Sequence, residues 1–166
     1  MLKKTKKNNK KRLVTIIGLL LGGVIGYLFF AKSIKEIPSF RYTDISTKTN
    51  FTNKDLKNNY KKIFIYFSPS CEDCGGLIKY IRTAKDKFDN TQILMVSTRP
   101  FTSLQQYAID NDVKSMKNTI ILHDSTQQFV QDFNLGSLVS LPTILVFDTN
   151  NALIFDGDDK DFITLM

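Results

Sequence analysis

The sequence predicts an α/β fold in which helices cover both faces of a central mixed β-sheet. Runs of β-branched and aromatic residues alternate with runs of helical spacing along most of the chain, which is typical of a mostly parallel sheet. Residues 63–67 (IFIYF) read as a buried strand that a Ser-Pro-Ser step ends. Residues 143–155 have the pattern of strand, turn and strand, so we expect an antiparallel pair at one edge of the sheet.

The only two cysteines of the chain, Cys71 and Cys74, directly follow the strand at 63–67. Apolar residues recur at helical spacing beyond them, which places Cys71 at the start of a helix and Cys74 one turn inside it. Unpaired backbone N–H groups and the helix dipole stabilise a thiolate at that position, so we expect the pKa of Cys71 to be lowered. Residues three apart on a helix are neighbours, so a disulfide between the two sulfurs can form and break with little backbone movement.

The net charge of +7 is concentrated at the N-terminus. Residues 1–12 contain seven Lys and Arg residues and no acid, whereas the remaining 16 basic residues are balanced by 16 acidic ones. Because the charge is confined to a short tail, with no basic face interleaved with aromatic residues, nucleic-acid binding is not expected.

Residues 13–31 (LVTIIGLLLGGVIGYLFFA) carry no charge and are long enough to span a bilayer as a helix. With basic residues before this segment, the positive-inside rule predicts a cytoplasmic tail at 1–12 and everything after the transmembrane anchor outside the cytoplasm. We therefore expect a single-pass protein of the bacterial cytoplasmic (inner) membrane, with its catalytic domain in the periplasm or extracellular space. The alternative is a signal peptide cleaved at Ala31-Lys32-Ser33.

The rest of the chain reads as a spacer and one domain. Residues 32–50 are polar, so we expect a juxtamembrane spacer that becomes the first edge strand. Residues 51–166 are long enough to bury one core, which should be rich in phenylalanine. Further strands are predicted at 92–97, 119–122, 143–147 and 152–155, and helices at 55–60, 101–109 and, behind a Ser125 cap, 127–133.

The order of these elements, the Cys-x-x-Cys pair and the Leu141-Pro142-Thr143 step that opens a strand and hairpin resemble the thioredoxin-like superfamily. The extra strand and helix within 119–133 make the chain most similar to the membrane-anchored thiol-disulfide oxidoreductases of the redoxin branch. That branch is related to alkyl-hydroperoxide reductases and includes the cytochrome c maturation reductases. The resemblance covers residues 36–157.

The resemblance implies a role for each residue of the motifs. Cys71 would be the exposed attacking cysteine and Cys74 the buried resolving one. Pro142 would be a cis-proline facing the disulfide, and the backbone of Leu141 would pair with an extended substrate as an added strand. The other residues that we expect to bind substrate are the neighbours of the first cysteine: Ser70, Glu72 and Asp73.

The chain departs from the family pattern around the cysteines. Pro69-Ser70 stand where relatives have a tryptophan, and Ile65 stands where many carry a buried carboxylate, so Cys74 has no evident base. Gly75-Gly76 weaken the first turn of the helix by about 1–2 kcal/mol relative to alanines, so we expect a mobile site.

Three other functions fit parts of the pattern. A structural zinc site lacks ligands, because His123 is the only residue available to complete the cysteine pair. A copper chaperone would bind copper through Cys71, Cys74 and His123, although related chaperones place three residues between the cysteines. A thiol-dependent peroxidase would use Ser68, three residues before Cys71, but the nearby proline of such relatives is missing.

Thiol-disulfide exchange through Cys71 and Cys74 is therefore the function we expect, with no metal or organic cofactor. Its partners would be protein disulfide clients and a transmembrane electron donor. Glu72 and Asp73 oppose a thiolate on Cys71 and raise its pKa, which favours a reductase. The sequence leaves the client, the donor and the oligomeric state open.

Overall fold

The structure is a computed structural model that describes residues 14–16 and 36–166. The chain divides into two units, Met1–Ser33 and Ile34–Met166. Of the first unit only a helical turn at 14–16 is described, so the predicted tail at 1–12 and nearly all of the predicted anchor at 13–31 lie outside the described residues. Within the described residues, no helix has the length and apolar character needed to cross a membrane.

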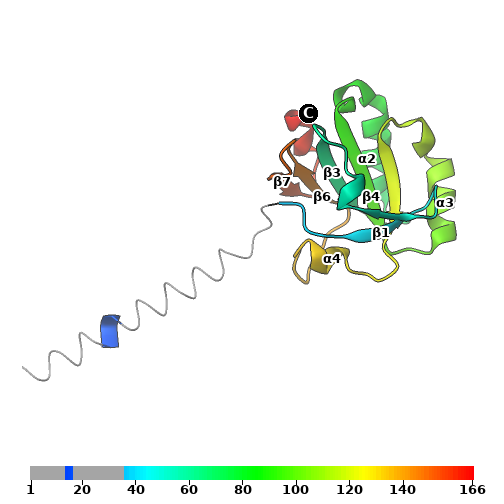
Figure 1. Cartoon of the computed structure of the whole chain (residues 1–166). Coiled ribbons are helices and arrows are strands. Elements are labelled where there is room, and N and C mark those ends of the chain that lie inside the picture. Colours follow the sequence, from blue (N-terminus) through cyan, green and yellow to red (C-terminus); the bar gives the residue numbers. More distant parts are fainter. Residues whose placement is uncertain (1–13, 17–35) are drawn as a thin grey trace, which may run out of the picture. The chain divides into compact units, whose positions relative to one another are not determined.

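The second unit is built on a seven-stranded sheet, counted over residues 36–166, with the order β2-β1-β5-β4-β3-β6-β7 (Figure 1). The strands are β1 Arg41–Asp44, β2 Asn50–Thr52, β3 Lys61–Tyr66, β4 Thr91–Ser97, β5 Thr119–His123, β6 Thr143–Phe147 and β7 Leu153–Gly157. The α-helices are α2 Glu72–Thr83, α3 Phe101–Asp110 and α4 Phe129–Asp132. Short 3-10 helices are η1 Asn53–Asp55, η2 Lys85–Phe88, η3 Val113–Ser115 and η4 Asp161–Leu165.

The sheet is mixed, as predicted, but it is not mostly parallel. Among the strands that the structure describes, only β3, β4 and β5 run parallel to one another. Antiparallel strands flank them on both sides, with β1 and β2 beyond β5 and with β6 and β7 beyond β3. The expected single antiparallel edge is therefore wrong, and β2 rather than β1 is the edge strand. The hairpin of β1 and β2 could not be predicted from the sequence, because β2 has three residues, too few to show an alternating pattern.

A hydrophobic cluster lies on each face of the sheet. Successive side chains of a strand point to opposite faces, so Ile63 and Ile65 pack with α2 and α3 whereas Phe64 packs with α4. The α4 face is dominated by aromatic rings, and the centroid of Phe64 lies 4.8 Å from that of Phe133. The expected phenylalanine-rich core is thus concentrated on one face. Truncating the fully buried Phe64 to alanine would cost about 3–5 kcal/mol.

Helix α4 is shorter than the predicted helix at 127–133. Gln127 has a left-handed backbone, with φ 57°, that cannot continue a helix. The expected cap at Ser125 is also wrong: the buried carboxylate of Asp124 accepts the N–H of Phe129 at 2.8 Å. An acceptor for the first helical N–H therefore comes from the end of the preceding strand.

The predicted helix at 55–60 is replaced by the shorter η1. A capping box joins Thr52 and Asp55 at its start, and Leu56 is already extended, so the helical segment ends after one turn. The short segment leads into β3, and Leu56, directly after it, packs against the aromatic face of the core.

Candidate active site

Cys71 and Cys74 form a disulfide at the junction of β3 and α2, with their Cα atoms 5.3 Å apart. Beyond Tyr66, Phe67 still donates its N–H to the carbonyl of Val96 at 3.0 Å, so the strand is held up to the turn. The N–H of Cys71 then donates to the carbonyl of Ser68 at 3.0 Å and closes the turn. The predicted strand, turn and helix context of the cysteines is confirmed.

The two sulfurs have different surroundings. Cys71 is the N-cap residue of α2 and is partly exposed, whereas Cys74 is fully buried among the apolar side chains of the α2 face. The backbone N–H of Cys74 donates to Sγ of Cys71 at 3.1 Å. A helix N-terminus stabilises negative charge through such N–H groups, so this donor is placed to stabilise a thiolate on Cys71 in the reduced form. Only this sulfur is accessible to a substrate.

The segment before β6 lies against the disulfide. The carbonyl oxygen of Leu141 is 3.6 Å from Sγ of Cys71, and the Leu141–Pro142 peptide bond is cis, as the resemblance implied. Leu141 is 36% exposed, whereas Pro142 is buried. The backbone of Leu141 therefore lies beside the reactive sulfur at the surface of the molecule.

The polar neighbours of Cys71 are all exposed. Ser70 Oγ lies 2.9 Å from Ser68 Oγ, so this side chain is turned toward the preceding turn. Glu72 and Asp73 occupy the first turn of α2, and neither forms an ion pair with a described residue. The structure therefore brings the predicted residues to one surface, while their roles in substrate binding stay predictions.

Arg99 is a residue of this site that the sequence analysis missed. It follows β4, and its Nε donates to Oγ of Ser68 at 3.2 Å. Ser68 is only 5% exposed, and its carbonyl holds the N–H of Cys71, so the guanidinium is linked to the turn that carries the attacking cysteine. The contact joins positions 31 residues apart and depends on the parallel pairing of β3 with β4. No local pattern in the sequence signals it.

His123 has a structural environment at the end of β5. It pairs with Thr43 of β1, and its ring centroid lies 6.0 Å from that of Phe101. Among residues 14–16 and 36–166, no three His, Cys, Asp or Glu side chains gather where they could hold a metal ion. The trio of Cys71, Cys74 and His123 considered for copper is therefore not assembled.

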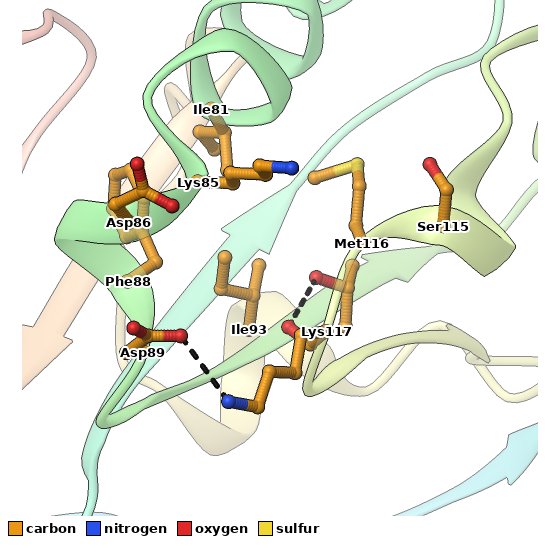
Figure 2. Close-up of a pocket in the computed structure, with 10 residues that line it drawn as sticks. Ile81, Lys85, Asp86, Phe88, Asp89, Ile93, Ser115, Met116 and Lys117 are labelled. Carbon is orange, nitrogen blue, oxygen red and sulfur yellow. Dashed lines mark hydrogen bonds and ion pairs between the residues drawn. The ribbon is translucent and has the colours of Figure 1, made fainter.

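A separate pocket of about 290 Å³ lies away from the cysteines (Figure 2). Its lining includes the apolar residues Ile81, Phe88, Ile93 and Met116, and the ion pair of Lys117 with Asp89, at 3.2 Å, borders it. Ile93 lies near the start of β4, whereas the disulfide follows the end of the parallel neighbour β3. The pocket and the redox pair are therefore at opposite ends of the sheet.

Comparison with known proteins agrees with this arrangement. The sequence model described as the AhpC/TSA family matches residues 34–155. The solution structure of a candidate thioredoxin from Neisseria meningitidis has a TM-score of 0.61 and 26% identity, covering 79% of this chain and 85% of that one. A thiol peroxidase from Chromobacterium violaceum has a TM-score of 0.63 and 17% identity, covering 80% of this chain and 83% of that one. The second likeness shows the fold alone, which is thioredoxin-like.

A curated protein, major royal jelly protein 5 of Apis mellifera, is 27% identical over 128 residues. The match covers 72% of this chain and 21% of the bee protein, so the chain spans about a fifth of that relative's length.

Proposed function

The chain belongs to the AhpC/TSA family of thioredoxin-like redox proteins, and from this premise we propose that it is a membrane-tethered reductase of protein disulfides outside the bacterial cytoplasm. One observation carries the proposal: a partly exposed Cys71 and a fully buried Cys74 share one disulfide at the start of α2. Such a pair reacts with an external disulfide through one sulfur and resolves the product through the other.

The exchange runs in two steps from the reduced protein. The Cys71 thiolate attacks one sulfur of a client disulfide, the client S–S bond breaks, and the other client sulfur leaves as a thiolate that takes up a proton. The Cys74 thiolate then attacks Sγ of Cys71, and the first client sulfur leaves in turn. Two electrons have passed to the client, and the protein is left as the disulfide described above.

The charges beside Cys71 support reduction over oxidation. Glu72 and Asp73 lie within one helical turn of its sulfur and oppose the thiolate that the N–H of Cys74 favours. A strongly oxidising pair owes its power to a stabilised reduced thiolate, so these carboxylates make the reduced form a better electron donor. Turnover as a reductase requires a transmembrane electron donor that returns two electrons to the disulfide.

Trapping of clients tests the redox reaction. In the full-length chain, Cys74→Ser should accumulate mixed disulfides, because Cys71 still attacks but the resolving thiol is gone. Cys71→Ser is the matched control and should trap nothing. Tight stoichiometric copper binding, with no turnover of an insulin-like disulfide, would instead favour the copper chaperone and overturn the proposal.

The tether rests on the sequence of residues 1–31, where a basic tail precedes an uncharged segment. A reporter that is active only outside the cytoplasm should work when fused after Met166, and the full-length chain should stay in membranes after high-salt washing. Release of a fragment that starts near residue 34 would show cleavage instead of anchoring.

Reduction of a peroxide is a second candidate, favoured by the contact of Arg99 with Ser68. N–H donors near the attacking sulfur can stabilise the oxygen that departs when a peroxide O–O bond breaks. Cys71 would take one oxygen as a sulfenic acid while water or an alcohol leaves, and Cys74 would then displace that oxygen as water and close the disulfide.

Rapid mixing of the reduced protein with hydrogen peroxide distinguishes the two activities. A peroxidase should oxidise far faster than a free thiol, and Arg99→Gln should remove most of that acceleration while leaving disulfide exchange largely intact. Oxidation at the rate of free cysteine would exclude the peroxidase.

A further inference from the structure

A small pocket of about 220 Å³ opens beside the segment that precedes β6. One part of its lining is apolar, formed by Leu135, Leu138 and Val139, and another part is acidic, formed by Asp156 and Asp158 at the end of β7. We refer to this combination as the leucine–aspartate pocket. Its chemistry differs from that of the pocket in Figure 2, where cations and anions are both present.

Part of the lining of the leucine–aspartate pocket directly precedes, in the sequence, the residue that contacts the reactive sulfur. Its wall includes Val139 and Ser140, and the following residue, Leu141, places its carbonyl 3.6 Å from Sγ of Cys71. Each residue of an extended chain spans at most about 3.3–3.6 Å. A polypeptide whose cysteine is bonded to Cys71, and which runs alongside residues 139–141, would therefore bring residues two or three positions away over this pocket.

The apolar part of the pocket is open to a partner. Leu138 is 95% exposed and Leu141 is 36% exposed, although leucine is a residue that proteins usually bury. Covering these side chains with an apolar residue of a partner removes their surface from water, which is favourable. The surface beside the disulfide thus matches an apolar client residue.

The acidic part carries charge that the described residues do not neutralise. Asp158 accepts a hydrogen bond from Ser140 Oγ at 3.1 Å, and neither Asp158 nor Asp156 forms an ion pair with any described cation. The Asp156 side chain is exposed, and desolvation by the protein around its carboxyl raises its pKa. Glu72 and Asp73 add two more negative charges beside Cys71, whereas the positive Arg99 lies on the β4 side of the site.

We infer that the leucine–aspartate pocket binds the residues that flank a client's cysteine and selects segments in which an apolar residue is next to a lysine or arginine. The occupant follows from charge complementarity, because an acidic segment would meet like charges from Asp156 and Asp158 in the pocket. The inference rests on the proposed disulfide exchange and specifies which clients it favours.

Three peptides with a single cysteine test this preference. In each, the cysteine is joined by a disulfide to 2-nitro-5-thiobenzoate, whose release is followed by its colour, and the flanking pairs on both sides are Leu-Lys, Leu-Glu or Ser-Lys. Full-length protein, reduced beforehand, is mixed with excess peptide in a single turnover. The Leu-Lys peptide should react about two- to fivefold faster than the Leu-Glu peptide, and the ratio should shrink in high salt.

Matched variants locate the preference. Asp156→Asn combined with Asp158→Asn should bring the Lys-to-Glu ratio markedly closer to one, because asparagine keeps an acceptor for Ser140 but removes the charge, while Glu72 and Asp73 stay in place. Asp110→Asn combined with Asp112→Asn removes two exposed carboxylates near the end of α3 and should leave the ratio unchanged. Leu138→Ser should slow the Leu-Lys peptide and leave the Ser-Lys peptide unaffected.

An uncharged disulfide, dipyridyl disulfide, reports on the chemistry without the flanking residues and should react equally with every variant. Equal rates for the Leu-Lys and Leu-Glu peptides would overturn the inference while leaving the disulfide exchange intact. A Lys-to-Glu ratio that is unchanged in the double asparagine variant of the pocket would also overturn it, since Asp156 and Asp158 would then not be the groups that select the charge. If neither the peptides nor dipyridyl disulfide react, the proposed function itself fails.

Discussion

The backbone N–H of Cys74 donates to the sulfur of Cys71 at 3.1 Å, so the buried member of the pair stabilises charge on the exposed one. This donor belongs to the backbone and is present whatever side chains follow Cys71. Differences in redox behaviour therefore depend on the residues between the cysteines, and here both are acidic.

Replacing Glu72-Asp73 with Gly-His should lower the pKa of Cys71 and make the couple more oxidising by some tens of millivolts, where about 30 mV corresponds to about 1.4 kcal/mol. The physical reason is the removal of two negative charges within a turn of the sulfur. Equilibration against a glutathione buffer measures the potential. A Gln-Asn version removes the charges without adding histidine and should give part of the shift. A reduction potential that is unchanged in both variants would show that these carboxylates do not determine the direction of electron transfer.

Replacing Gly75 and Gly76 with alanine should raise the free energy of unfolding by about 1–2 kcal/mol, because alanine restricts the unfolded chain and favours the helix. Both glycines lie in α2, and a Cβ at either position would meet nothing within 4 Å. Gly157→Ala is the contrasting variant, since its Cβ would lie 2.8 Å from the ring of Phe155 and the ring must shift. Urea unfolding of the disulfide form compares them, and a loss of stability in the double alanine variant would contradict the expectation.

Asp124→Ala should lower the free energy of unfolding by about 1–3 kcal/mol, because the buried N–H of Phe129 loses its carboxylate acceptor. Ser125→Ala should change it by less than about 0.5 kcal/mol, since Ser125 is exposed and does not cap α4. Thermal or urea unfolding of the two variants shows whether Asp124 or its neighbour Ser125 stabilises the start of α4. Equal losses would mean that α4 is capped differently in solution.

Tyr107→Phe should leave stability unchanged or raise it at pH 7, because the Tyr107 hydroxyl is buried and makes no hydrogen bond with a described residue. Burial raises the pKa of Tyr107 from 10.0 to about 12. The folded state thus holds this proton more tightly than the unfolded state, so stability should fall as the pH rises from about 10 to about 12.

The alkaline loss of stability should be smaller in Tyr107→Phe than in the parent. Part of what remains belongs to Tyr42, whose pKa is also raised by burial and by its hydrogen bond to Asp132 at 2.8 Å. Melting temperatures measured between pH 9 and pH 11 provide the comparison. Identical pH profiles for the parent and Tyr107→Phe would show that ionisation of Tyr107 does not contribute to the alkaline loss of stability.

The redox pair could be predicted because its signals are local. The apolar run at 63–67 and the helical spacing beyond Cys74 determine a strand, a turn and a helix within about twenty residues. The Leu141–Pro142 step was found only through the family resemblance, since no local pattern places it against Cys71. Its position depends on the antiparallel pairing of β3 with β6.

The features that were missed depend on distant contacts or on single backbone angles. Arg99 reaches Ser68 only because β4 lies beside β3, and Asp124 replaces Ser125 as the acceptor at α4 because Gln127 adopts a left-handed conformation. Periodicity carries no information about either. The β1-β2 hairpin was not predicted for a related reason. These short polar strands form because they pair with neighbouring strands, and their own sequences show no strand pattern.

The first described residues of the second unit form backbone contacts with the domain at a point far from the disulfide. Glu36 pairs with Ala152, and Ile37 donates its N–H to the carbonyl of Asn151, both at the turn between β6 and β7. That turn lies beside the start of β3, whereas Cys71 follows its end, about 20 Å away along six residues of strand. A mechanical pull on the chain before Glu36 therefore acts first on the β6–β7 turn, at the end of the sheet opposite the catalytic edge.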